Sequence, residues 1–164
     1  QEPEIVVKGT ALIKSGRTLE TTLDENQTEG AAWLMRKAKK STVIIEHRGS
    51  ELSVKITKDS IDVELDNEDG RLKYKADIVL VAHAFKEIKT TEESDEVSRE
   101  VSAAVEKMCK SAWEASLEQN NADIFGIWRL LRHSYPQSWL EYEDNTDEIY
   151  PFCDLELSVK VLVE

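Results

Sequence analysis

The sequence has few of the features that mark specialised classes of protein. It contains two cysteines, Cys109 and Cys153, in 164 residues, too few for the disulfide framework of a small secreted domain. Two buried thiols are the expected state, and a disulfide between them is the alternative. No stretch approaches the roughly 18 apolar residues of a membrane-spanning helix. No glycine-rich phosphate loop or G-x-S-x-G serine motif occurs, so an enzyme of either kind is not expected.

Positive charge is scarce as well. Lys and Arg number 21 against 33 Asp and Glu, which gives a net charge of −12. Such a chain lacks the basic arrays that hold phosphate backbones or anionic lipids, so neither nucleic acid nor an anionic lipid surface is an expected partner. The acidic excess is concentrated in residues 90–164, which carry 17 acidic and 6 basic side chains.

The three histidines do not form a metal-binding or catalytic motif in the sequence. His47, His83 and His133 are far apart in the sequence and lack the short spacings of zinc sites. We expect structural or surface roles for all three. We also expect no catalytic residue, no cofactor and no bound metal.

The chain is long enough for one domain, residues 1–164, with a substantial core. Hydrophobic residues make up 40% of it, the proportion of a soluble globular protein. Four tryptophans are expected to lie mostly in that core, and an exposed recognition surface is the alternative for them. They are Trp33, Trp113, Trp128 and Trp139.

Alternating apolar and polar residues predict strands in three regions. Residues 4–23 read as a hairpin with its turn at residues 15–16, and residues 41–89 read as an antiparallel meander. A last alternating run, residues 155–163, is expected to join the sheet. Turn-forming residues divide the meander at residues 48–50, 58–60 and 67–70.

Capping signals and helical spacing predict the helices. Asp24, with Gln27 three residues later, begins a short amphipathic helix at residues 24–38, and Thr90 precedes a long helix at residues 92–119. Asp123 and Pro136 each precede a further short helix. One face of the long helix is apolar and is expected to point inward, through Val97, Val101, Ala104, Val105 and Met108. The predicted fold is α+β, an antiparallel sheet with the long helix across one face and shorter helices near the C-terminus.

One acidic segment has no basic neighbours in the sequence. It comprises Glu141, Glu143, Asp144, Asp147 and Glu148. We expect this segment to be the best single candidate for a surface that contacts a partner, with a solvated loop as the plain alternative. A calcium site is a weaker alternative, because the segment lacks the glycine and distal glutamate of an EF-hand loop.

Several short motifs occur in a characteristic order along the chain. Residues 8–11 (KGTA) precede residues 27–34 (QTEGAAWL), and residues 123–126 (DIFG), 135–139 (YPQSW) and 147–151 (DEIYP) follow. In order and approximate spacing they resemble the C-terminal domain of the Ger(x)C family, the C subunit of nutrient germinant receptors in spore-forming bacteria. The resemblance spans nearly the whole chain.

The resemblance implies a non-enzymatic domain that acts through protein–protein contacts in nutrient-triggered spore germination. It implies a fragment of a longer lipoprotein, held at the outer face of the spore inner membrane by a lipidated cysteine. The implied partners are the integral-membrane subunits of the receptor. A small-ligand or metal-binding extracytoplasmic domain is the alternative function.

Overall fold

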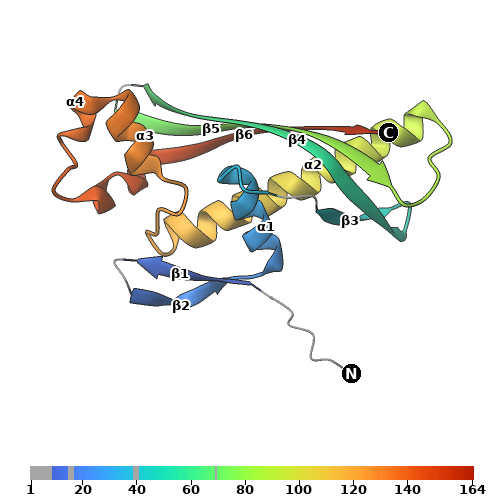
Figure 1. The fold of residues 1–164 in the computed structure, drawn as a ribbon, viewed down its shortest axis with the longest axis horizontal. Helices are drawn as coiled ribbons and strands as arrows, with labels where there is room; N and C mark the ends of the chain where they lie inside the picture. Colours follow the sequence, from blue (N-terminus) through green and yellow to red (C-terminus); the bar gives the residue numbers. More distant parts are fainter. Residues whose placement is uncertain (1–8, 15–16, 39–40, 69) are drawn as a thin grey trace.

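The computed structural model describes residues 9–14, 17–38, 41–68 and 70–164. Residues 4–8 of the expected hairpin, and its turn at residues 15–16, lie outside this range. The elements, in chain order, are β1 (Thr10–Lys14), β2 (Arg17–Leu23), α1 (Glu25–Leu34), β3 (Thr42–His47), β4 (Ser50–Glu68), β5 (Arg71–Ala84), α2 (Thr91–Trp113), the π-helical turn η1 (Glu114–Glu118), α3 (Ile127–Ser134), α4 (Pro136–Trp139), the 3-10 turns η2 (Thr146–Glu148) and η3 (Tyr150–Phe152), and β6 (Cys153–Val163). The α+β class is confirmed (Figure 1).

The main sheet has four strands in the order β3-β4-β5-β6. The pairs β3–β4 and β4–β5 are antiparallel, as the meander predicts. β6 joins the sheet as expected but runs parallel to β5, with Leu72 opposite Cys153. Parallel neighbours need a crossover connection, and α2 with the segment after it supplies one. The chain therefore re-enters the sheet at the end where β5 begins.

The turn expected at residues 58–60 is wrong, because β4 continues through them as one strand. The register against β5 shifts between Ile56 and Lys58, which places one extra residue, Thr57, in β4. Because a bulge adds one residue to the strand, the inward-facing positions change from even to odd residue numbers, or the reverse, beyond it. Buried residues accordingly fall at even positions up to Ile56, while the inward residues further on, such as Leu65, fall at odd ones. Thr57 Oγ1 donates a hydrogen bond to the Val81 carbonyl oxygen at 3.1 Å, which satisfies that carbonyl at the irregularity.

The other two turns of the meander are confirmed where they are described. Arg48 and Gly49 both have positive φ, 50° and 77°, the geometry of a tight hairpin between β3 and β4. Gly70, with φ of 82°, begins the return from β4 to β5, while its neighbour at residue 69 lies outside the described part of the chain.

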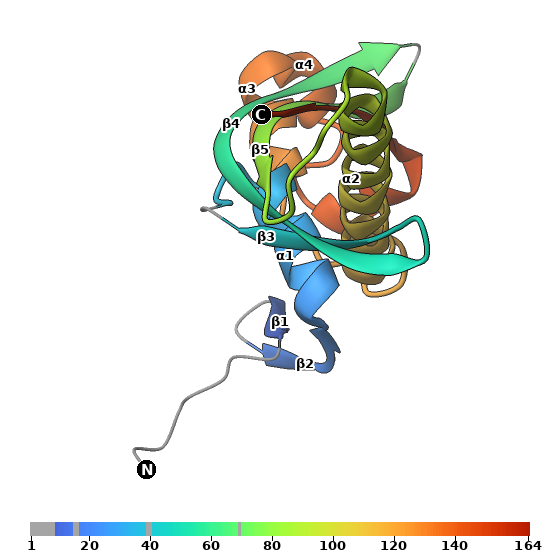
Figure 2. The ribbon, with the colours of Figure 1, turned by 90° about the vertical axis from the view of Figure 1, so that its right-hand side faces the viewer.

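The long helix α2 lies across one face of the sheet, as predicted (Figure 2). Its buried side chains recur at helical spacing, and Ala104 and Met108 are partly buried beside them. Thr90 caps the helix by accepting a hydrogen bond from the Glu93 backbone N–H at 3.1 Å. The inward face is made by Val97, Val101, Val105, Cys109 and Ala112.

The short helix α1 begins at the predicted cap and ends four residues early. Asp24 Oδ1 accepts from the Gln27 backbone N–H at 2.8 Å, and Gln27 Oε1 accepts from the Asp24 N–H at 3.0 Å. At the other end Arg36 has φ of 56°, and the Lys37 N–H donates to the Ala32 carbonyl at 2.8 Å. This left-handed residue with its backward hydrogen bond stops the helix.

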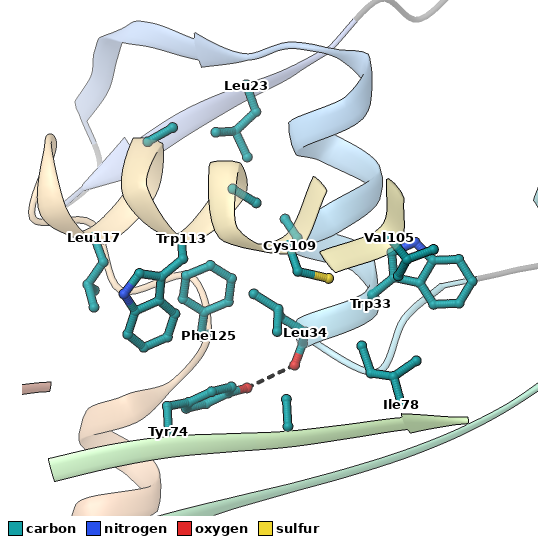
Figure 3. Close-up of a cluster of buried hydrophobic side chains, with 14 of the residues drawn as sticks. Leu23, Trp33, Leu34, Tyr74, Ile78, Val105, Cys109, Trp113, Leu117 and Phe125 are labelled. Carbon is teal, nitrogen blue, oxygen red and sulfur yellow. Dashed lines mark hydrogen bonds between the residues drawn. The ribbon is translucent and has the colours of Figure 1, made fainter. Parts of the chain in front are cut away.

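The core lies between the sheet and the helices α1 and α2 (Figures 1 and 3). Trp113 stacks on Phe125 with ring centroids 5.2 Å apart, and the Tyr74 hydroxyl donates to the Leu34 carbonyl oxygen at 2.8 Å. The two cysteines are free and buried, as expected. Trp33 and Trp113 are core residues, also as expected. Trp128 and Trp139 are only partly buried, which departs from the expectation for all four.

Candidate interaction surface

Residues 123–152, here called the C-terminal lobe, pack at the end of the sheet where β4 turns into β5 (Figure 1). Asp123 fixes their first turn. Its Oδ1 accepts from the backbone N–H of Gly126 at 2.7 Å and of Ile127 at 3.0 Å, and its Oδ2 accepts from that of Trp128 at 3.1 Å. One carboxylate thus satisfies three donors at the start of α3. Gly126 has φ of 78°, a conformation that glycine adopts without strain.

The lobe is attached to the sheet through both helices. Ile127 and Leu131 of α3 are fully buried, and the Asn67 side-chain amide at the end of β4 donates to the Ser138 hydroxyl of α4 at 3.1 Å. Pro136 stands at the first turn of α4, where a missing N–H costs nothing. The lobe is therefore a fixed part of the fold.

Half-buried aromatic rings join the two helices at the surface of the lobe. Trp128 and Trp139 lie with ring centroids 6.0 Å apart, and the Arg129 guanidinium lies 5.1 Å from the centre of the Trp128 ring. Leu140 and Phe152 are 56% and 52% exposed. Partly exposed aromatic and apolar side chains of this kind are enriched where proteins bind other proteins.

The predicted acidic segment lies in the same lobe. Glu141, Glu143, Asp144 and Glu148 are exposed, and Asp147 is half-buried. The segment follows α4 in successive turns, with Asn145 Nδ2 donating to Glu148 Oε1 at 2.7 Å, and the fully buried Ile149 anchors its end. The five residues lie within one short stretch that directly follows Leu140 in the chain.

The four exposed carboxylates make no ion pair within the described part of the chain. Acidic side chains elsewhere do: Glu96 pairs with Arg48, Asp66 with Lys75, and Asp154 with Arg71. The sequence has no Lys or Arg between Arg132 and Lys160. The negative charge of the segment is consequently left to solvent or to a partner.

Side chains that could bind a metal ion are dispersed over the described part of the chain. Nowhere in the described residues do three His, Cys, Asp or Glu side chains gather closely enough to hold a metal ion. His47 is buried with Nδ1 2.8 Å from Glu100 Oε2, while His83 and His133 are exposed on β5 and α3. The three histidines share no site.

Sequence reasoning did not single out Leu140 and Phe152. The sequence signal is their position: Leu140 directly precedes the acidic segment, and Phe152 directly follows Pro151. Both residues add exposed apolar surface to the C-terminal lobe.

No helix of the described residues combines the length and hydrophobicity that crossing a membrane requires.

Residues 8–164 match the family described as spore germination B3/GerAC like, C-terminal. The chain belongs to this family of germinant-receptor C-subunit domains, as its motifs indicate.

The fold is similar to that in the crystal structure of the GerBC protein, with a TM-score of 0.84 at 14% sequence identity. The match covers 95% of this chain and 51% of that one. The chain thus spans about half the length of GerBC, and the similarity at this identity concerns the fold. No curated protein matches the sequence.

Proposed function

We propose that this domain is a non-enzymatic part of a germinant-receptor C subunit and works by contacting the integral-membrane subunits of the receptor. The proposal takes residues 1–164 as one domain of a longer lipoprotein, held by its lipid at the outer face of the spore inner membrane. Family membership supports the receptor context.

The observation that carries the proposal is the combination of charge and exposed apolar surface on the C-terminal lobe. Four exposed carboxylates without ion pairs in the described part of the chain follow Leu140, which is 56% exposed. A basic partner would relieve the repulsion among these carboxylates and bury the leucine, so the surface suits a protein partner that is itself basic. Association through such a surface weakens as salt screens the charges.

Charge reversal on the full-length protein in spores tests this. Glu143→Lys combined with Asp144→Lys should reduce copurification of the integral-membrane subunits and slow germination after a nutrient is added. Leu140→Asp should have the same effect through the apolar part of the surface. Both variants change exposed side chains, so the domain should remain folded.

The matched control is Asp62→Lys combined with Asp77→Lys. These two exposed residues lie opposite each other on β4 and β5, and their reversal changes the net charge by the same amount away from the lobe. Normal assembly is expected for this control. Normal assembly of the lobe variants, or an equal defect in the control, would remove the lobe as the interface.

A further inference from the structure

A pocket of about 270 Å³ lies between the C-terminal end of α1, the inner face of β4 and β5, and the start of α3. Its apolar lining comes from three separate parts of the chain, Leu34 on α1, Val63 and Tyr74 on the sheet, and Phe125 and Leu130 in the C-terminal lobe. Figure 3 shows Leu34, Tyr74 and Phe125 close together, with Tyr74 bonded to the Leu34 carbonyl. That hydrogen bond and the buried rings hold this side of the pocket in place.

Three cations accompany the apolar lining. Arg36, Lys37 and Arg129 line the pocket, and none of the described residues that line it is an Asp or a Glu. This is unexpected in a chain with 33 acidic and 21 basic residues. In the described part of the chain Arg36 and Lys37 have no ion-pair partner, whereas Arg48, Arg71, Lys73 and Lys75 each contact a carboxylate.

The backbone at Arg36 gives a second reason to assign a function to this cluster. Its φ is 56°, at the position after a helix where glycine is the usual residue. A left-handed conformation costs a non-glycine residue about 1 kcal/mol. Glycine would end α1 without that cost, so helix termination alone does not favour an arginine at this position.

We propose that this pocket binds a small molecule with an oxyanion head, a carboxylate or a phosphate monoester, and a compact apolar body. Guanidinium groups recognise both head groups through paired hydrogen bonds, while Leu34, Tyr74 and Phe125 receive the apolar part. The volume is near the lower end of ligand pockets, roughly 300–1,000 Å³, which suits one small molecule. This site is separate from the acidic surface of the C-terminal lobe and from the partner proposed for it.

The site can be tested by nuclear magnetic resonance titration of the 164-residue chain with matched probes. Benzoate and phenyl phosphate supply the two head groups on the same apolar ring, benzyl alcohol is neutral, and benzylammonium is cationic. Inorganic phosphate supplies a head group alone. Benzoate or phenyl phosphate should shift the backbone amides of Arg36, Gly126 and Leu130, with an affinity about tenfold above that of benzyl alcohol. Inorganic phosphate should bind more weakly than phenyl phosphate, and benzylammonium should not bind.

Arg36→Gly separates charge from folding. It removes a cation but relieves the left-handed backbone, so its melting temperature should equal or exceed that of the parent while the affinity for benzoate falls about tenfold. Val63→Phe, which fills the pocket, should abolish the shifts. Lys107→Gln removes a positive charge from an exposed position on α2 outside the pocket and should leave the affinity unchanged.

Three results would overturn the proposal. The first is equal affinity for benzoate and benzyl alcohol together with no binding of phenyl phosphate. The second is a set of shifts that lies away from the pocket, and the third is unchanged anion affinity in Arg36→Gly.

Discussion

Gly30 in α1 faces the backbone of Met108 in α2 so closely that a β-carbon on Gly30 would lie 2.1 Å from the Met108 carbonyl oxygen. The next nearest atoms are also backbone, at 2.3 and 2.7 Å, so no side-chain rotation could make room. The two helices can cross at this distance only with glycine at residue 30. This gives a physical role to the glycine in the segment QTEGAAWL.

Gly30→Ala should therefore destabilise the domain. Forcing α1 and α2 apart disturbs packed core on both helices, and overpacking of this kind costs about 1–3 kcal/mol or more. Urea unfolding followed by circular dichroism would measure the loss. Gly49→Ala is the control, because a β-carbon there meets nothing within 4 Å and only the left-handed φ is penalised, by about 1 kcal/mol. Equal losses for the two variants would contradict the close crossing.

Replacing Asp123 should loosen the C-terminal lobe. Asp123→Ala leaves three backbone N–H groups at the start of α3 without their acceptor, and loss of such a cap costs about 1–2 kcal/mol. Asp123→Asn should cost less, since its one remaining oxygen can still accept from Gly126 and Ile127. Hydrogen exchange would show faster exchange at the amides of residues 126–128 in the alanine variant. Unchanged exchange at those amides would show that the carboxylate does not hold the turn.

Local signals predicted most of the elements because the interactions that make them are local. The capping box at Asp24 and the cap at Thr90 each involve residues three apart, and the apolar stripe of α2 lies within one helix. The direction of β6 was not predictable in this way. Alternation shows that residues 155–163 form a strand, but the path of the chain after α2 decides whether it lies parallel to β5.

The bulge at Thr57 explains why the sequence predicts a turn at residues 58–60 although the alternating pattern on either side of it is read correctly. Apolar residues change from even to odd positions around it, and a change of parity reads as two strands with a turn between them. With Lys58, Asp59 and Ser60 at this point, the sequence alone does not distinguish a turn from a bulge. The partner strand β5 settles it, because β5 pairs with both halves of β4.

The two candidate sites differ in how far sequence could predict them. The acidic segment is continuous, so its composition alone marked it. The pocket is assembled from residues near positions 36, 63, 74 and 129, whose proximity depends on the packing of α1, the sheet and α3. Arg36 and Lys37 in the sequence look only like the basic end of a helix.

The tryptophans should differ in what their removal costs. Trp33 is fully buried, and Trp33→Ala should cost about 3–5 kcal/mol as expected for a core aromatic. Trp128 is partly exposed beside Trp139 and under Arg129, so Trp128→Ala should cost less, roughly 1–2 kcal/mol. Urea unfolding of the two variants compares them directly. Equal costs would mean that Trp128 contributes to the core as fully as Trp33 does.

Cys109 and Cys153 are free thiols buried in the fold. Burial raises the pKa of the Cys109 thiol from 9.0 to about 12, and burial with the nearby Asp123 charge raises that of Cys153 to about 12. Burial also raises the pKa of the Tyr150 hydroxyl to about 12. All three groups remain protonated in the folded protein at pH values where the unfolded chain has already lost its protons.

Stability should therefore fall as the pH rises from about 9 to about 12, because the unfolded chain binds fewer protons than the folded one in this window. Below pH 9 both states hold these protons and the groups add no pH dependence. The urea midpoint of Cys109→Ala should decline less steeply over the same window than that of the parent, whatever its value at neutral pH. Iodoacetamide at pH 8 should leave both thiols of the native protein unmodified and alkylate both in urea, because only the thiolate reacts and burial suppresses it. Rapid alkylation of the native protein, or parallel pH profiles for the parent and Cys109→Ala, would show that the thiols are accessible to solvent.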